Sequence, residues 1–412
     1  MKRILIFLLM AEVFLCTELF AANNKTNNSQ DAGAFMNENT DVRMQNFLAK
    51  IRRGEEVNVV ALGGSITTGF AAKNPAKEGW AGLTGEWLKK LGEKNSSKVN
   101  YYNRAVSGTD SAFAVARYDS HIKALNPDLL LLEFAMNDQW LDPKVRKRTY
   151  EAIIRRTLCE SDCAILVLFV NERKAPYSSN QVEQQQICEY YHVPFVSWKE
   201  CVQKEGSLSD FEKYFDGQEG IHPNNAGHAK IAQFLEEEIE RVWKNLPSDS
   251  KIAAVEKNLP PALTDKGFEK VEYYGNANLQ PVENEGWTAG SPVHNEWVSH
   301  GNVVRGWQCN QGGAELTFEV EGSSIGITYC ESDQFCDAKA WVTKADRTRG
   351  PVVTLNCFSS GRKGYYGWAY KQLIDGNTVE KYTVHIICSK KVANGDENKF
   401  CNITGILAAK EK

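Results

Sequence analysis

The chain has 412 residues, 42% of them hydrophobic, which is long enough for two domains that each bury a core. Its 48 Lys and Arg residues nearly balance its 52 Asp and Glu residues, and the formal net charge is −4. Because no long basic run is present to follow a phosphate backbone, the composition argues against nucleic acid as a partner.

The N-terminus has the pattern of a secretory signal peptide. A short basic start precedes an apolar stretch, and we expect cleavage near Ala21 or Ala22. Cys16 does not fit a lipoprotein anchor, because a bulky residue stands before it where a small one is needed. Residues 1–22 are therefore predicted to be a signal peptide, residues 23–40 a flexible lead, and the mature protein secreted or periplasmic. No later apolar run reaches the roughly 18 residues of a membrane span.

Residues 41–245 alternate short apolar runs with helical patterns. The apolar runs predict strands at Val57–Leu62, Val99–Val106, Asp128–Phe134, Ala164–Val170 and Val193–Val196. The helical patterns include Val42–Arg53, Trp80–Lys94, Thr149–Leu158, Gln181–Tyr191 and Ala226–Lys244. This alternation is typical of a parallel sheet with helices on both faces.

The pattern changes after residue 245. Residues 246–262 contain several Pro, Ser and Asp residues and predict a linker, whereas residues 263–412 contain short runs rich in Gly, Thr, Val and aromatic residues. These runs predict an all-β domain, a sandwich or jelly roll, with strands at Ala314–Val320, Ser324–Cys330, Lys339–Val342, Val352–Asn356 and Tyr382–Cys388.

Ten cysteines follow the predicted signal peptide, four of them in residues 41–245 and six in residues 263–412. Even numbers in both parts predict disulfides in an oxidising compartment, with a pairing that the sequence does not give. A zinc site would need close Cys-x-x-Cys pairs or Cys/His spacing, so no metal site is predicted.

Three of the predicted strands end in residues that suit nucleophilic catalysis. Ser65 follows Gly63-Gly64 after the first strand, Gly108 lies in the loop after the second, and Asn137 follows the third. The carboxyl ends of parallel strands meet at one edge of a sheet, so we expect these residues to lie close together. A serine hydroxyl becomes an effective nucleophile when a base takes its proton and nearby donors receive the developing charge. Backbone N–H groups of the glycine-rich loops and the Asn137 amide can be those donors.

The expected base is His222, because an imidazole takes and returns a proton near neutral pH. It lies in a Gly/Pro/Asn-rich loop directly before the last long helix. His121, His192 and His228 fit this role less well, because they lie in helical or connecting segments.

These residues resemble the four motif blocks of the SGNH (GDSL-type) hydrolase family. The blocks are Gly63-Gly64-Ser65-Ile66, Gly108, Asn137-Asp138 and Gly220-Ile221-His222-Pro223, in the order of the family and over about half of the chain. The resemblance implies a flavodoxin-like three-layer α/β/α fold and ester hydrolysis through an acyl-enzyme. It implies Ser65 as nucleophile, His222 as base, and an oxyanion hole made by Ser65 N–H, Gly108 N–H and the Asn137 amide.

Three groups are candidates for the third member of the catalytic set, the group that orients the His222 ring. The family usually has Asp three residues before its histidine, but Glu219 occupies that position here, and Asp216 lies three residues further upstream. Glu219 is the preferred acid, Asp216 is the alternative acid, and the third possibility is a backbone carbonyl that orients the ring. A second departure is Ala135, where a glycine commonly precedes the Asn-Asp element.

Two acidic residues near the motifs have structural interpretations. Asp138 is expected to be ionised and to cap the turn or helix that follows it. Glu133 lies within an apolar strand and needs a partner if it is buried, for which Arg104 and Arg117 are candidates.

The leading function is O-deacetylation of a carbohydrate, a plant cell-wall polysaccharide such as xylan. Trp80 and Trp140 are candidate substrate contacts, and the aromatic residues of the β-domain form either a sugar platform or its core. This chemistry needs no metal or organic cofactor. The alternatives are a short-chain lipolytic or general carboxylesterase, a glycan O-acetyltransferase, and a non-catalytic glycan-binding protein.

Overall fold

The structure is a computed structural model that describes residues 34–35, 38–206, 208–217, 220–247, 253–290, 306–361, 366–389 and 400–411. The predicted signal peptide and Glu219 lie outside these residues. No helix in the described ranges is long and apolar enough to cross a membrane.

The first domain is built on a six-stranded sheet with the order β1-β6-β5-β4-β2-β3. Five strands are parallel: β2 (Val57–Gly63), β3 (Val99–Asn103), β4 (Leu129–Glu133), β5 (Ala164–Phe169) and β6 (Phe195–Ser197). They confirm the five predicted strands. Within the predicted flexible lead, β1 (Ala34–Phe35) pairs antiparallel with β6, so this part of the lead extends the sheet.

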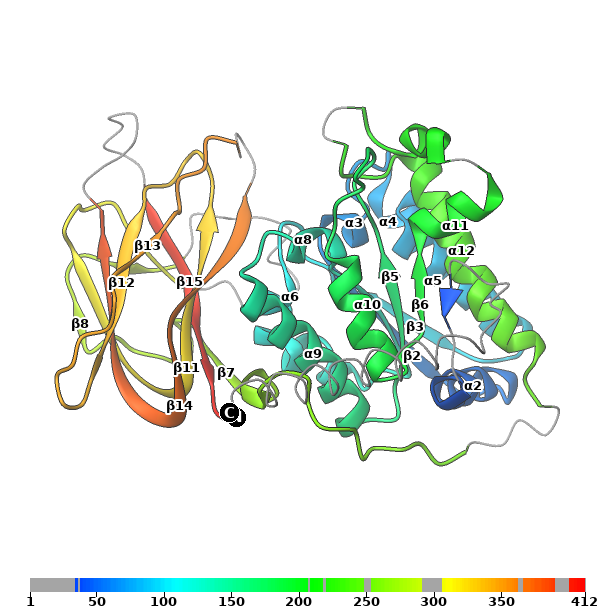
Figure 1. The fold of residues 1–412 in the computed structure, drawn as a ribbon, viewed down its shortest axis with the longest axis horizontal. Coiled ribbons are helices and arrows are strands. Elements are labelled where there is room, and N and C mark those ends of the chain that lie inside the picture. The colour runs from blue at the N-terminus through cyan, green and yellow to red at the C-terminus, as the bar shows by residue number, and fades with distance from the viewer. Residues whose placement is uncertain are drawn as a thin grey trace, which may run out of the picture.

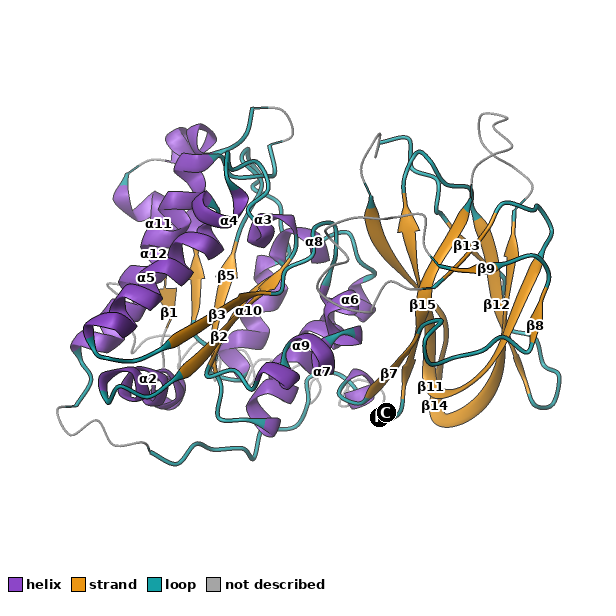
Figure 2. Ribbon diagram, turned by 180° about the vertical axis from the view of Figure 1, so that it is seen from behind, coloured by secondary structure: helices purple, strands orange, loops and turns teal. Residues whose placement is uncertain are grey.

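Helices cover both faces of this sheet, as Figures 1 and 2 show. One face carries α2 (Glu38–Arg52), α5 (Trp80–Lys94), α11 (Trp198–Glu205) and α12 (Asn225–Lys244). The other carries α6 (Ser111–Ala116), α7 (Tyr118–His121), α9 (Pro143–Glu160) and α10 (Gln181–Tyr190). Successive strand residues alternate between two apolar clusters; Val59 and Leu131, for example, belong to one cluster, and Val60 and Leu130 to the other. The predicted three-layer α/β/α fold is therefore confirmed.

Short helical segments complete the first domain and its exit. They are α3 (Ser65–Thr68), α4 (Pro75–Glu78), α8 (Ala135–Asp138), and the 3₁₀ segments η1 (Lys123–Leu125), η2 (Leu208–Tyr214) and η3 (Lys266–Phe268). Side chains cap the longer helices where the sequence has Asp or Asn. Asp142 accepts from the backbone of Lys144 and Val145 at the start of α9, and Asn224 accepts from Gly227 at the start of α12.

The second domain is antiparallel and all-β, as expected. Its strands are β7 (Val271–Tyr274), β8 (Glu283–Asn284), β9 (Thr288–Ala289), β10 (Trp307–Cys309), β11 (Glu315–Glu331), β12 (Ala338–Lys344), β13 (Val353–Leu355), β14 (Gly367–Cys388) and β15 (Cys401–Ala409). The main path is β13-β12-β14-β11-β15-β10-β9, with β7 on β15 and β8 on β11. The two strands predicted at 314–320 and 324–330 are one long strand, β11, with register shifts beside Ser324 where the prediction had a break.

The two domains share their apolar cores. Val106 and Phe113 of the first domain belong to the apolar cluster of the β-domain, whereas Tyr370 and Leu407 of the β-domain belong to a cluster of the first domain. The buried Arg148 of α9 adds a polar link, since its Nε donates to Asp265 Oδ1 at 2.8 Å and its Nη1 donates to Asp375 Oδ1 at 3.3 Å. We therefore regard the interface as part of the fold.

The predicted linker is not a free tether where the structure describes it. The Ala253 N–H donates to Asn46 Oδ1 at 2.9 Å, and Arg155 donates to the Pro260 carbonyl at 2.9 Å. These bonds fasten the connecting segment to α2 and α9.

None of the ten cysteines in the described ranges forms a disulfide, so the expected disulfides are not present in the structure. Most of these side chains are buried and pack as small apolar groups. Three of them meet at one end of the β-domain: Cys401 Sγ lies 3.3 Å from both Cys336 Sγ and Cys388 Sγ.

Candidate active site

Ser65 lies at the end of β2, where the chain turns into α3. Gly63 and Gly64 are needed there because other groups occupy the space of a side chain. A Cβ on Gly63 would lie 2.7 Å from the Glu133 carbonyl oxygen, and one on Gly64 would lie 2.6 Å from Asn137 Oδ1. The two glycines thus allow the turn to pack directly against Glu133 of β4 and Asn137 of α8.

Ser65 and His222 are in contact. Ser65 Oγ lies 2.8 Å from His222 Nε2, although the two residues are 157 positions apart in the chain. The ring of His222 also packs against Phe70, with centroids 4.5 Å apart. Both side chains are half-buried, which leaves the pair open to a ligand. This is the geometry of a nucleophile and its base.

The loop that carries His222 is held by its backbone. The Asp216 N–H donates to the His222 carbonyl at 2.8 Å, and Phe215 forms a bridge with Pro223. Asn224 Nδ2 donates to the Phe215 carbonyl at 3.0 Å. Asp216, the alternative acid, therefore positions the His222 backbone, while the preferred acid Glu219 lies outside the described residues.

The two predicted oxyanion donors converge on the same place. Asn137 packs on Gly64, and both Asn137 and Gly108 line one cavity. Gly108 has a φ of +71°, a conformation that favours glycine. Thr68 ties this loop to α3, since its Oγ1 bonds the Ser65 carbonyl and lies 2.8 Å from Ser107 Oγ. The structure thus brings Ser65, His222, Gly108 and Asn137 to one edge of the sheet.

His228 is a structural residue. Its Nδ1 accepts from the Trp80 N–H at 3.3 Å, and its Nε2 lies 3.0 Å from the Phe70 carbonyl oxygen. Burial lowers the pKa of His228 to about 4, so the ring is neutral near pH 7. It supports Phe70, the residue on which the His222 ring packs.

Trp80 is not a substrate contact. Its side chain is completely buried in the core between the sheet and α5, so the expectation that it contacts substrate is wrong. Trp140 is the opposite case, with 75% of its surface exposed. Only Trp140 of this pair remains a candidate contact.

Glu133 finds partners other than the expected arginines. The Thr67 hydroxyl donates to Glu133 Oε2 at 3.0 Å, whereas Arg117 bonds the Arg104 carbonyl. Burial raises the pKa of the Glu133 carboxyl to about 7, against hydrogen bonds from Thr67 and the Gly64 backbone. This acid lies beneath the serine turn and joins it to β4.

Asp138 also differs from its expected role. Its Oδ1 accepts from the Ser111 N–H at 2.9 Å, and its Oδ2 accepts from Gln184 Nε2 at 2.8 Å. It therefore accepts a hydrogen bond at the start of α6, which precedes it in the chain, whereas Asp142 caps the following helix α9. Burial raises the pKa of Asp138 well above its ordinary value, which argues against the expected full ionisation.

A cavity of about 610 Å³ lies between the domains beside Gly108 and Asn137, the predicted oxyanion donors. The first domain contributes Gly108, Asn137 and Trp140, and the β-domain contributes Glu331, Trp368, Lys371 and Gln372. Its wall therefore combines aromatic, charged and amide groups. The β-domain completes a cleft that the first domain forms only in part.

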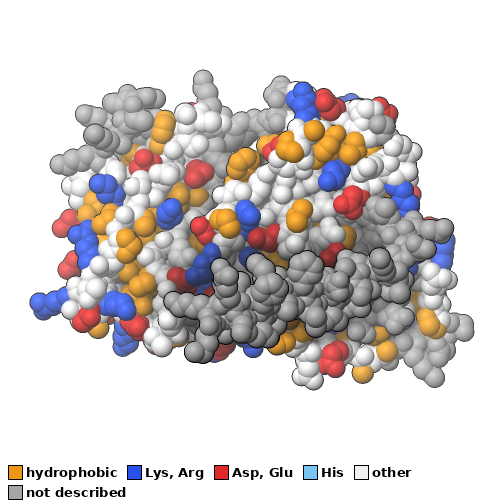
Figure 3. All heavy atoms as spheres, in the orientation of Figure 1, with side chains coloured by type: hydrophobic (Ala, Val, Ile, Leu, Met, Phe, Trp, Pro, Cys, Tyr) orange, Lys and Arg blue, Asp and Glu red, His pale blue; other side chains and the backbone are white. Residues whose placement is uncertain are grey.

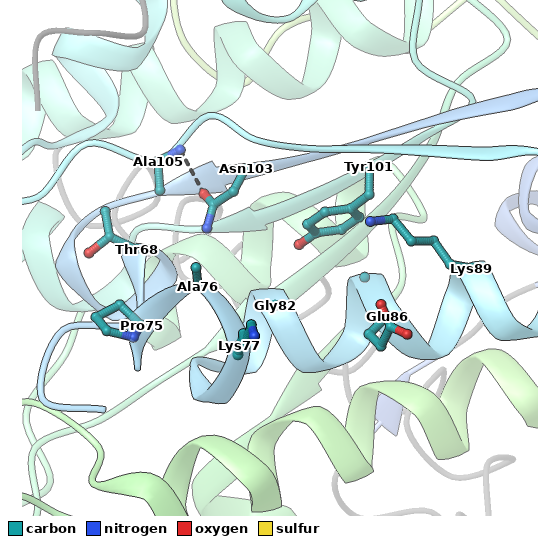
Figure 4. Close-up of a pocket in the computed structure, with 11 residues that line it drawn as sticks. Thr68, Pro75, Ala76, Lys77, Gly82, Glu86, Lys89, Tyr101, Asn103 and Ala105 are labelled. Atoms are coloured by element: carbon teal, nitrogen blue, oxygen red, sulfur yellow. Dashed lines mark hydrogen bonds between the residues drawn. The ribbon is translucent and has the colours of Figure 1, made fainter. Parts of the chain in front are cut away.

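A second cavity, of about 860 Å³, lies between α5 and the edge strand β3. Figure 4 shows Tyr101 of β3 facing Glu86 and Lys89 of α5 across it, with Asn103 of β3 nearer to Ala76. Thr68 lines its end nearest α3.

Several residues of the site were not predicted. Thr67, Thr68 and Phe70 lie within five residues of Ser65 in the sequence. Because a short helix after the serine would keep them close to it, their nearness in the sequence could have indicated that they belong to the site. Trp368 lies more than 200 residues away, and nothing in the sequence linked it to Gly108.

Comparisons with known proteins give a family match and similar solved structures. Residues 61–230 match the model of the GDSL-like Lipase/Acylhydrolase family. A search of curated proteins gives no match.

Among solved structures, a two-domain esterase (CEX) active on acetylated mannans is similar over both domains. The TM-score is 0.77 at 21% identity, covering 92% of this chain and 98% of the other. The same kind of esterase co-crystallised with mannopentaose gives a TM-score of 0.74 at 21% identity, covering 90% and 95%.

The acetylxylan esterase Axe2 from Geobacillus stearothermophilus covers 48% of this chain and 99% of its own, at 19% identity and a TM-score of 0.37. The family match falls on the segment that holds Ser65, Gly108, Asn137 and His222. Residues 61–230 therefore match the GDSL-like lipase/acylhydrolase family, and the fold of the whole chain, with its all-β domain at the C-terminal end, is similar to that of a two-domain esterase.

Proposed function

We propose that the protein is a secreted serine esterase that removes O-acetyl groups from a carbohydrate through an acyl-enzyme. The observation that carries this proposal is the 2.8 Å contact between Ser65 Oγ and His222 Nε2 beside two oxyanion donors. The family match supports the ester chemistry, and the similar two-domain fold of an esterase active on acetylated mannans supports the substrate class.

In the first half of the reaction, His222 Nε2 takes the Ser65 hydroxyl proton while Oγ attacks the acetyl carbonyl carbon. The carbonyl oxygen becomes an oxyanion, which accepts from Ser65 N–H, Gly108 N–H and the Asn137 amide. The bond between the acetyl carbon and the sugar oxygen then breaks. His222 returns its proton to that oxygen, leaving a sugar hydroxyl and acetyl-Ser65.

In the second half, water replaces the sugar. His222 takes a proton from water as it attacks acetyl-Ser65, and the same donors stabilise the second oxyanion. The bond to Ser65 Oγ breaks, the proton returns to the serine, and acetate leaves. No step needs a metal or an organic cofactor.

We propose Glu219 as the acid that orients His222 and stabilises its protonated form. It stands three residues before the histidine in the sequence, and Asp216 already uses its backbone to hold the His222 carbonyl. We expect Glu219→Gln to lower kcat by more than ten-fold and Asp216→Asn to lower it less. If Asp216→Asn has the larger effect on kcat, Asp216 is the third member.

The interdomain cavity is the proposed binding site for the carbohydrate. Its charged and amide side chains suit sugar hydroxyls, and the exposed indole of Trp140 offers a flat face for a sugar ring. We expect Trp140→Ala to raise KM for an acetylated polysaccharide several-fold. The same variant leaves the hydrolysis of 4-nitrophenyl acetate unchanged if Trp140 only binds sugar.

A panel of substrates tests the function. We expect acetate release from acetylated mannan or acetylated xylan, and preference for acetate over butyrate esters of 4-nitrophenol. A general carboxylesterase would hydrolyse the butyrate ester as well as the acetate ester and leave the polysaccharides acetylated. An acetyltransferase would transfer the group to an added glycan instead of releasing acetate, and a binding protein would show no turnover.

The proposed export has its own test. We expect the mature protein to begin near residue 22 or 23 when it is produced in its native host. Recovery of the full-length chain from the cytoplasm would contradict export.

A further inference from the structure

The loop that carries the oxyanion donor Gly108 touches the β-domain through its backbone. The Trp368 N–H of β14 donates to the Gly108 carbonyl at 3.0 Å. A Cβ on Gly108 would lie 3.1 Å from the Tyr366 carbonyl oxygen and 3.2 Å from Gly367 Cα. Gly108 therefore packs directly on the start of β14.

Side chains reinforce this contact. The ring of Trp368 stacks on Phe113 of α6, with centroids 5.6 Å apart and an interplanar angle of 17°. Val106 and Phe113, on either side of Gly108 in the chain, both belong to the apolar cluster of the β-domain. The β-domain thus fixes the segment both before and after Gly108.

The opposite side of the loop is held by the first domain. The Val106 N–H donates to the Gly63 carbonyl at 3.1 Å, and Ser107 Oγ lies 2.8 Å from Thr68 Oγ1. These contacts orient the peptide that contains the Gly108 N–H, and the Trp368 bond orients the peptide that contains the Gly108 carbonyl. Gly108 lies between these two peptides with a φ of +71°. Because a glycine can adopt many other conformations, these contacts are needed to hold it in this one.

We propose that the start of β14 is a positioning element of the esterase: Gly367 and Trp368 hold Gly108 in the conformation that aims its N–H at the oxyanion. This inference rests on the proposed function, and Trp368 acts through Gly108 without touching the reacting atoms. A β-domain with this role affects every acyl substrate, including one too small to reach its surface. A β-domain that only binds sugar affects polysaccharides alone.

The experiment compares three substitutions of Trp368 in the full chain, with 4-nitrophenyl acetate as substrate. Trp368→Phe keeps both a ring and the N–H, Trp368→Ala keeps only the N–H, and Trp368→Pro keeps neither. Proline is compatible with this position because the N–H bonds outside the strand ladder.

We expect Trp368→Phe to keep kcat within two-fold of the wild type. We expect Trp368→Pro to have a kcat at least ten-fold below that of Trp368→Ala, with KM within three-fold, since loss of one oxyanion donor costs about 10²–10³ in kcat. Equal kcat values for the proline and alanine variants, or a loss confined to KM, would overturn the proposal.

If thermal unfolding shows that Trp368→Pro is not folded, a second measurement tests whether the start of β14 positions Gly108. In a double-mutant cycle of Phe113→Ala and Trp368→Ala, we expect the effects on kcat to differ from additivity by three-fold or more. Additive effects would overturn the proposal. Failure of the proposed function is a separate result, because then the wild type itself would not hydrolyse the acetyl ester.

Discussion

At the scale of single residues, the serine turn depends on what packs against its glycines. Asn137 occupies the space beside Gly64, and Thr67 and the Glu133 carbonyl occupy the space beside Gly63. The same contacts that bring Asn137 to Ser65 exclude any larger residue from the turn.

We therefore expect substitution of Gly64 to disturb the proposed oxyanion hole more than the fold. In Gly64→Ala the new methyl group would lie 2.6 Å from Asn137 Oδ1, so the Asn137 side chain must move away from Ser65. We expect kcat to fall about 100-fold, the range for loss of one oxyanion donor. Steady-state kinetics and thermal unfolding check this, and an unchanged kcat would show that Asn137 is not a donor.

Glu133 makes stability depend on pH. Its pKa is about 7 in the folded protein and 4.5 as its ordinary value, so the folded state holds the proton more tightly. Stability from this group is complete below pH 4.5 and is lost as the pH rises through 7. The difference between the two pKa values corresponds to about 3.5 kcal/mol in total, at roughly 1.4 kcal/mol for each tenfold change in proton affinity.

We expect the free energy of unfolding of the wild type, relative to Glu133→Gln, to fall by about 3 kcal/mol between pH 4.5 and pH 7.5. The comparison with the variant is needed because His228, whose pKa is lowered to about 4, contributes with the opposite sign over part of this range. Denaturant titrations of both proteins across this pH range measure the difference in the free energy of unfolding. A constant difference would show that Glu133 is ionised normally.

At the scale of elements, the apolar runs predicted the sheet well because buried parallel strands are continuously hydrophobic. The strand ends then placed Ser65, Gly108 and Asn137 together, and a loop rich in Gly, Pro and Asn identified His222. The β-domain was harder. Most of β14 (Gly367–Cys388) alternates polar and apolar residues or contains charges, and only its last part was predicted as a strand.

The positions of the aromatic residues of the β-domain were also hard to predict from the sequence. Trp287 and Trp307 are buried, which assigns these two residues to the core alternative, whereas Trp368 packs on Phe113 and also lines the interdomain cavity. Composition does not distinguish a core tryptophan from one on a surface, because that depends on which strands pack face to face. The exposed Trp140 lies in the first domain instead.

At the scale of the whole molecule, the two domains share apolar clusters and a buried ion-pair network, and their charges are mixed. On the face shown in Figure 3, Lys and Arg side chains alternate with Asp and Glu. The link at Arg148, between Asp265 and Asp375, lies in the interface. Two domains could be predicted from the sequence, but this contact could not, because the partners are more than 100 residues apart.

We expect both domains to unfold in one cooperative transition. Substitution of Arg148 by Ala leaves Asp265 and Asp375 without their shared partner, and we expect a loss of about 3–5 kcal/mol. Differential scanning calorimetry measures both effects. Two separate transitions in the wild type would contradict a shared core.

Kinetics of Ser65→Ala and His222→Ala test whether Ser65 and His222 form the catalytic pair. Acetate release from an acetylated polysaccharide is measured for both variants and for the wild type, with circular dichroism to show that the variants are folded. We expect each variant to lose about 10⁴-fold or more in kcat. Near-wild-type acetate release by either folded variant would contradict the account.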